Sequence, residues 1–149
     1  MTRSTLLFAL ASVILASCAL NKIFLHPYEL HTTDDFSTYV KEIDDTVTMT
    51  FTSERDPIVL DSKQEVPNLS YTLENIFFPN SIGDTLNAWL FTPKENYNGH
   101  TIYFLHGNAG HIVYQYTFVT PFVNEGYQVF IQDYSGFGFS DGKSTRKNV

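Results

Sequence analysis

Alternation of hydrophobic and polar residues predicts strands in the middle of the chain. The stretch 47–52 alternates with a period of two, which is typical of a strand with one buried face. Two further apolar runs, residues 75–79 and 86–91, flank the turn-forming sequence Ser81-Ile82-Gly83-Asp84. This arrangement predicts a β-hairpin.

A strand, a helix and a second strand are predicted after the hairpin. Residues 101–105 and 129–133 are short apolar runs, and apolar residues between them recur at helical spacing, with Gly126 as the C-cap. Pro121 is expected to kink this helix or to restart it after Thr120. The order predicts a βαβ unit, that is, a parallel pair of strands covered by helices. Together with the hairpin it predicts a mixed sheet and the α/β fold class.

A tether and one helix are predicted for residues 18–45. Pro27 suits the first turn of a helix, and apolar residues follow it at loosely helical spacing; these are Tyr28, Leu30, Phe36, Tyr39, Val40 and Ile43. The stretch that follows the strand at 47–52 is polar, carries Pro57 and Pro67, and is predicted to be a loop.

The first twenty residues have the pattern of a secretion signal. Arg3 provides a positive charge, and the fifteen residues 6–20 carry no charge. A helix that spans a bilayer needs roughly 20 apolar residues, so residues 1–17 are predicted to be a signal peptide. A buried helix is the alternative interpretation of this stretch.

The end of this apolar stretch, Leu15-Ala16-Ser17-Cys18, resembles the lipobox of bacterial lipoproteins, in which the cysteine becomes the acylated first residue. Cys18 is the single cysteine of the chain, so it cannot form an internal disulfide. The resemblance implies lipidation at Cys18 and a membrane-anchored protein of the bacterial cell envelope that faces the periplasm or the exterior. An ordinary signal peptide, with Cys18 removed or left as a free thiol, is the alternative.

Composition and charge narrow the functional classes. Of 149 residues, 43% are apolar, and nine Lys and Arg stand against sixteen Asp and Glu, for a net charge of −7. The apolar content indicates one core-forming domain, which is expected over residues 46–149. The negative net charge argues against a nucleic-acid partner. No metal and no cofactor are expected, because His106 and His111 have no third ligand at suitable spacing.

Two glycine-punctuated loops follow predicted strands. His106-Gly107-Asn108-Ala109-Gly110 comes directly after the strand 101–105, and residues 133–142 read Asp-Tyr-Ser-Gly-Phe-Gly-Phe-Ser-Asp-Gly. Glycines allow backbone N–H groups to approach a ligand without a Cβ clash. With the hairpin before them, the loops resemble the opening of an α/β-hydrolase, and most closely the Bem46-like serine hydrolases, over residues 68–145. Ser135 departs from the arginine usual in that group.

The resemblance implies that the first loop supplies a donor of an oxyanion hole. Removing one such donor typically costs about 2.7–4 kcal/mol of transition-state stabilisation. The backbone N–H of Asn108 is the expected donor, with that of Ala109 as second choice. His106 would orient the loop through hydrogen bonds, and Gly107 and Gly110 would let it turn. Alternatively, His106 and Asn108 are plain turn residues.

Ser140 fits the G-x-S-x-G signature of a nucleophile elbow, but its context does not. An elbow serine directly follows a strand, and its base lies downstream in the chain. Here the strand ends near Asp133, and the last histidine is His111. No nucleophile is therefore expected in this chain. A dinucleotide loop is excluded as well, because Asp141 stands where G-x-G-x-x-G requires a glycine.

The predicted function is that of the N-terminal portion of a lipid-anchored serine hydrolase. Its substrate would be a small acyl ester or thioester, and its nucleophile, acid and base would lie beyond Val149, so the chain alone would be inactive. The strand that ends at Leu105 would then form an apolar edge of an incomplete sheet. Two alternatives stay open: a non-catalytic surface lipoprotein with a binding or structural role, and a component completed by a second polypeptide.

Overall fold

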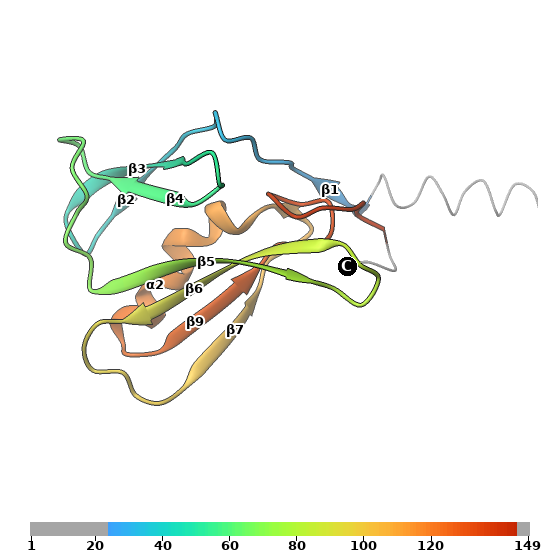
Figure 1. Cartoon of the computed structure of the whole chain (residues 1–149). Coiled ribbons are helices and arrows are strands. Elements are labelled where there is room, and N and C mark those ends of the chain that lie inside the picture. Colours follow the sequence, from blue (N-terminus) through green and yellow to red (C-terminus); the bar gives the residue numbers. More distant parts are fainter. Residues whose placement is uncertain (1–23, 146–149) are drawn as a thin grey trace, which may run out of the picture.

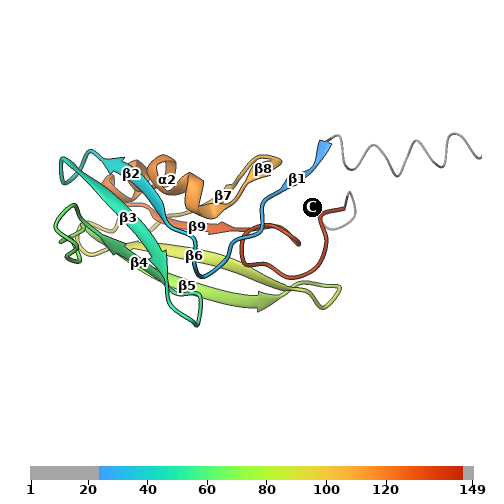
Figure 2. The same ribbon diagram turned by 90° about the horizontal axis from the view of Figure 1, so that it is seen from above.

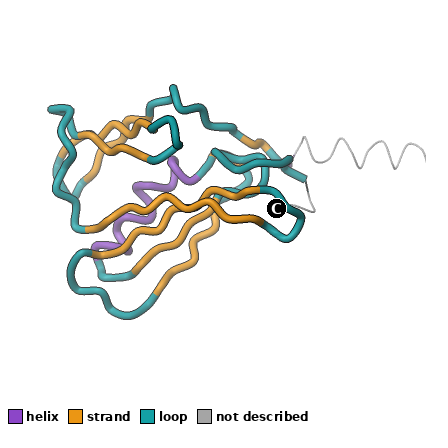
Figure 3. The backbone as a smooth tube through the Cα atoms, in the orientation of Figure 1, coloured by secondary structure: helices purple, strands orange, loops and turns teal. Residues whose placement is uncertain are grey.

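The fold is β-rich. The computed structural model describes residues 24–145, so the predictions for residues 1–17 and Cys18 lie outside it. Of the described residues, 41% are in strands, which form three small sheets, and 11% are in helices (Figure 3). The predicted α/β class is therefore wrong, because a three-stranded antiparallel sheet stands where a helix and a loop were expected.

This antiparallel sheet consists of β2 (Phe36–Val40), β3 (Asp45–Phe51) and β4 (Pro57–Leu60), in that order. The strand β3 confirms the prediction for residues 47–52. The helix predicted within residues 18–45 is wrong, since Val40 is buried while Ser37 and Tyr39 are exposed, which is a period of two. Thr, Tyr and Val also favour strands. Pro57 opens β4 on a sheet edge, where a missing N–H is tolerated.

The second sheet has four strands in the order β5-β6-β9-β7. The hairpin of β5 (Tyr71–Pro79) and β6 (Thr85–Pro93) is antiparallel, as predicted, and longer than expected. The strand β9 (Gln128–Gln132) runs antiparallel to β6 and parallel to β7 (Thr101–Leu105). The sheet is therefore mixed, and β7 lies at its edge.

The crossover between β7 and β9 contains the 3₁₀-helix η1 (Ile112–Gln115) and the helix α2 (Tyr116–Asn124). Pro121 lies inside α2 without ending it. Gly126 follows the helix at φ +88°, and an added Cβ would lie 2.3 Å from the carbonyl oxygen of Asn96. The predicted glycine stop is therefore confirmed, and it also allows the loop before β7 to approach the end of the helix.

The core fills the space between the two larger sheets, and one face of α2 packs onto it (Figures 1 and 2). Fully buried side chains come from both sheets and from the helix: Val47, Trp89, Phe91, Val119, Val129 and Ile131. The prediction that helices would cover the parallel pair is wrong for one face, because Thr101, Tyr103 and Leu105 of β7 are exposed. Among residues 24–145, no helix has both the length and the apolarity to cross a membrane.

The third sheet joins the start of the described chain to the first glycine loop. The strand β1 (His26–Pro27) pairs in parallel with β8 (Ala109–Gly110). Glu29 forms an isolated parallel bridge with Gly138 of the second glycine loop. We call residues 24–30 the strap, because they run beside both loops (Figure 2).

Candidate functional site

His106 closes the end of β7 with a buried imidazole. Its Nε2 lies 3.1 Å from Oδ1 of Asp133, and both side chains are fully buried. Nδ1 lies 2.7 Å from the carbonyl oxygen of Gly107, and the Tyr134 hydroxyl donates to the carbonyl of His106 at 3.0 Å. These contacts fix the start of the first glycine loop to the strand β9 and the loop after it.

The His106 ring and the Asp133 carboxyl are in contact in the protein interior. A carbonyl can only accept, so Nδ1 of His106 carries the proton that faces Gly107. Nε2 and Oδ1 are 3.1 Å apart, which is ion-pair distance, and Nε2 forms no hydrogen bond with the described residues. Burial raises the pKa of the Asp133 carboxyl, against the opposing effects of His106 and of the N–H of Ile112, which donates to Oδ1 at 2.9 Å. The carboxyl thus holds both ends of the first loop.

The backbone N–H of Asn108 faces away from this buried pair. Gly107, Asn108 and Ala109 are exposed, and within residues 24–145 the N–H of Asn108 donates no hydrogen bond. Its carbonyl accepts from the N–H of His26 at 3.1 Å, and its side-chain Nδ2 donates to the carbonyl of Phe24. Ala109, the second-choice donor, lies in β8 and pairs with β1. The donor predicted from the sequence is thus available to a ligand.

The second glycine loop packs against the same carboxyl. Gly138 has φ +55°, and an added Cβ would lie 1.9 Å from Oδ2 of Asp133. Ser135, where the resemblance leads one to expect arginine, is fully buried and accepts a hydrogen bond from Asn80 at 3.1 Å. This loop therefore serves as a packed support beside the first one.

The hydroxyl of Ser140 is hydrogen-bonded to two backbone groups. Its Oγ accepts from the N–H of Asn87 at 2.9 Å and donates to the carbonyl of Asp133 at 3.2 Å. It forms no hydrogen bond with a histidine in the part of the chain that the structure describes. With no base and with its hydrogen atom engaged, Ser140 lacks what a nucleophile requires.

His111 is not placed as a metal ligand by the described residues but lies in an aromatic environment. Both ring nitrogens are buried without a hydrogen-bond partner among the described residues. Tyr114 stacks on the ring at 4.3 Å between centroids, and Tyr28 and Phe36 lie at 5.2 Å. Burial, with a smaller effect from His106, lowers the pKa of His111 to about 4. The apolar run directly after it was the signal in the sequence for burial.

No metal centre is assembled by the described residues. His106 and His111 both lie beside the first loop, but residues 24–145 contain no group of three His, Cys, Asp or Glu side chains that could hold a metal ion. His106 faces Asp133, whereas His111 lies among aromatic rings. The two histidines therefore have separate environments.

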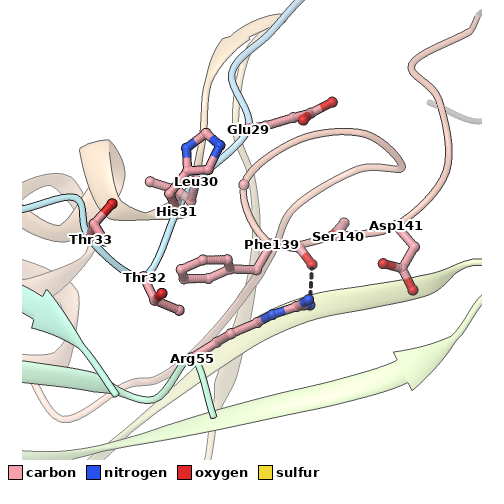
Figure 4. A pocket seen from close by; sticks show the side chains of 10 residues that line it. Glu29, Leu30, His31, Thr32, Thr33, Arg55, Phe139, Ser140 and Asp141 are labelled. Atoms are coloured by element: carbon pink, nitrogen blue, oxygen red, sulfur yellow. Dashed lines mark hydrogen bonds between the residues drawn. The ribbon is translucent and has the colours of Figure 1, made fainter. Parts of the chain in front are cut away.

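A pocket of about 430 Å³ lies between the strap, the β3–β4 turn and the second loop (Figure 4). The Arg55 guanidinium donates to the carbonyl of Phe139 at 3.3 Å and lies over the rings of Phe139 and Phe77, at 5.7 and 5.9 Å. In residues 24–145 no carboxylate lies within 4.0 Å of it, and the Glu29 side chain points away. The sequence pattern did not single out Arg55, because the turn that places it is local and its partners are distant in the chain.

In comparisons with known proteins, no family model, no curated protein and no solved structure matches the chain. The functional assignment therefore depends on the residues of the two loops.

Proposed function

We propose that this chain provides the oxyanion-binding part of a serine hydrolase that cleaves small acyl esters or thioesters. The observation that carries the proposal is the exposed N–H of Asn108, which has no acceptor within residues 24–145. A backbone donor held in place before the reaction is what stabilises a developing oxyanion. The buried His106–Asp133 pair and the strap supply that fixed position.

In this mechanism the nucleophile and its base come from outside the described residues. A serine oxygen attacks the acyl carbon, the base takes the serine proton, and the carbonyl oxygen becomes an oxyanion. The N–H of Asn108 donates to that oxygen, and when the carbonyl re-forms the bond to the leaving group breaks and the base gives its proton to the departing alcohol or thiol. Water, deprotonated by the same base, then attacks the acyl-serine, and its cleavage releases the carboxylic acid and returns the proton to the serine. The exposed edge of β7, directly before His106, is a place where a further strand with the nucleophile would be close to the loop.

The proposal includes attachment to the bacterial cell envelope through Cys18, with the membrane as a partner. It is supported by the lipobox-like sequence alone. Replacement of Cys18 by Ala is expected to leave the protein uncleaved or to release it from the membrane fraction. Unchanged membrane partitioning of the C18A variant would refute the anchor.

Sequencing the gene beyond codon 149 tests the catalytic proposal directly. We expect a G-x-S-x-G sequence, in phase or in a shifted frame, followed by a distant Asp and His. A stop codon followed by no such sequence in any frame contradicts the proposal. A parallel assay of the 149-residue chain with p-nitrophenyl acetate is expected to give no turnover, and turnover abolished by S140A would overturn the role given to Ser140.

The pocket at Arg55 favours a second function, a non-catalytic binding role. Its lining comes from three segments, and the guanidinium keeps donors for a ligand beyond its bond to Phe139. A stop codon without catalytic sequence, together with saturable binding of inorganic phosphate that R55Q abolishes, would favour this function over hydrolysis.

A further inference from the structure

The strap is hydrogen-bonded to both glycine loops. On the first loop, the N–H of His26 donates to the carbonyl of Asn108 at 3.1 Å. On the second loop, the N–H of Gly138 donates to the carbonyl of Tyr28 at 2.8 Å, and the N–H of Leu30 donates to the carbonyl of Gly138 at 2.9 Å. One short segment therefore sets the distance between two loops that follow neighbouring strands.

Asn108 is the residue where the strap meets the proposed oxyanion donor. Its side-chain Nδ2 donates to the carbonyl of Phe24, and its own carbonyl accepts from His26. These two contacts hold the side chain and the following peptide of Asn108 on the strap side. The peptide that carries the Asn108 N–H is held by its own carbonyl, that of Gly107, which lies 2.7 Å from Nδ1 of His106. An amide whose direction is fixed needs no reorganisation when charge develops on a substrate.

Aromatic packing anchors the middle of the strap. The ring of Tyr28 lies 5.2 Å from the ring of His111 and 6.3 Å from that of Tyr114. His111 directly follows the first loop, so this contact fixes the loop's far end. The strap thus contacts the first loop on both sides of Asn108.

We infer that residues 24–30 position the oxyanion loop, and that the side chain of Asn108 is the positioning residue. The role of this positioning in catalysis rests on the proposed function. The physical link between the strap and the first loop is independent of that function, because it follows from the contacts alone.

Hydrogen exchange of the full 149-residue chain, measured by NMR, tests this inference without any assay of hydrolysis. The variant N108D has the same shape but no donor for the carbonyl of Phe24. We expect the amides of His26 and Gly110, which are paired between the strap and the first loop, to exchange about fivefold faster in N108D, the effect of losing one hydrogen bond. The amides of β3 are expected to be unchanged. In the unsubstituted chain, the Asn108 side-chain NH₂ should give a protected, shifted resonance that N108D lacks.

A matched control is N98D, which introduces the same charge in a surface loop and keeps the acceptor for the N–H of His100. Equal acceleration of the first loop in N98D, or unchanged exchange of that loop in N108D, would overturn the inference. If N108D does not fold, the variant H26P is used instead. This variant removes the N–H of the strap that donates to the carbonyl of Asn108, and it leaves Asn108 itself intact. Unchanged loop exchange in H26P would likewise overturn it. A positive result with a gene that encodes no catalytic sequence would leave the strap valid and the proposed function wrong.

Discussion

Gly138 and Asp133 are so close that a Cβ on the glycine would overlap Oδ2 of the carboxyl, at 1.9 Å. The same carboxyl faces His106 at 3.1 Å and accepts from the N–H of Ile112. The two glycine loops are therefore joined from the inside by Asp133 and from the outside by the strap. Any side chain at position 138 would overlap the Asp133 carboxyl, so only glycine fits there.

The substitution G138A is expected to destabilise the protein by at least about 2 kcal/mol, from the left-handed backbone and from displacement of a buried carboxyl. Urea unfolding followed by the fluorescence of Trp89 measures the loss. The control is G83A, where φ is +92° but nothing lies within 4 Å of an added Cβ. Its cost should be about 1 kcal/mol, from the backbone alone. Equal losses in the two variants would contradict the close packing of Gly138 on Asp133.

Replacement of His111 by Phe should flatten the dependence of stability on pH between about 6.5 and 4. The pKa of His111 is lowered to about 4 in the folded state, so in this range the unfolded chain binds more protons than the folded one. Stability therefore falls as the pH decreases, by roughly 3 kcal/mol over the whole range. In H111F this part of the decrease should disappear.

The pH dependence is measured by urea unfolding at a series of pH values. His106 and Asp34 also act on His111, so the comparison is made between variants and not from one curve. H100N is the control, since it removes an exposed histidine that is not among the described contacts of His111. A slope in H111F as steep as in the unsubstituted chain would show that His111 is not the buried group that titrates.

The edge of β7 is expected to cause self-association. Leu105 and Tyr103 are each more than half exposed on a strand whose outer side pairs with no other described strand. L105K should reduce concentration-dependent association in light scattering and change stability by no more than about 0.5 kcal/mol. I82K is the control, because Ile82 is also more than half exposed but lies in the β5–β6 turn. A similar effect of both variants would assign the change to net charge and not to the edge.

The buried hydroxyl pair of Tyr71 and Tyr116 should show energetic coupling. The two hydroxyls are hydrogen-bonded to each other, and burial raises the pKa of Tyr116 to about 12. Y71F leaves the Tyr116 hydroxyl buried without this partner and should cost about 1–3 kcal/mol. The double variant Y71F/Y116F should cost less than the sum of the single ones, as chemical denaturation of all three variants would show. Additive losses would argue against the bond.

The sequence predicted the second sheet well because its signals are local. The turn at residues 81–84 and the apolar runs around it determine the hairpin, and Gly126 marks the end of α2. The strand β2 of the first sheet was predicted to be part of a helix. The reason is that Phe36–Val40 carries apolar residues at spacings that fit a loose helix as well as a strand. Its pairing with β3 decides between the two, and pairing is not visible along the chain. The α/β class was wrong for the same reason.

For the candidate site, the sequence indicated the two loops but not how they are held. The glycines and His106 could be recognised from their spacing after a strand. The contact of His106 with Asp133, the strap on Asn108 and the aromatic rings around His111 bring together residues far apart in the chain. No local pattern contains such contacts, so only the folded arrangement shows them.

The bridge between Glu29 and Gly138 joins the two ends of the described chain, and this has a consequence for the order of folding. During synthesis the strap leaves the ribosome before either of the larger sheets, but its partner follows only after both sheets have been made. Contacts between such distant positions form late, because a long loop must close before they are gained. The segment around Asn108 should therefore acquire its final geometry as the last step of assembly. A ribosome-bound intermediate arrested before Gly138 would contain the hairpin of β5 and β6 but not the arranged loop.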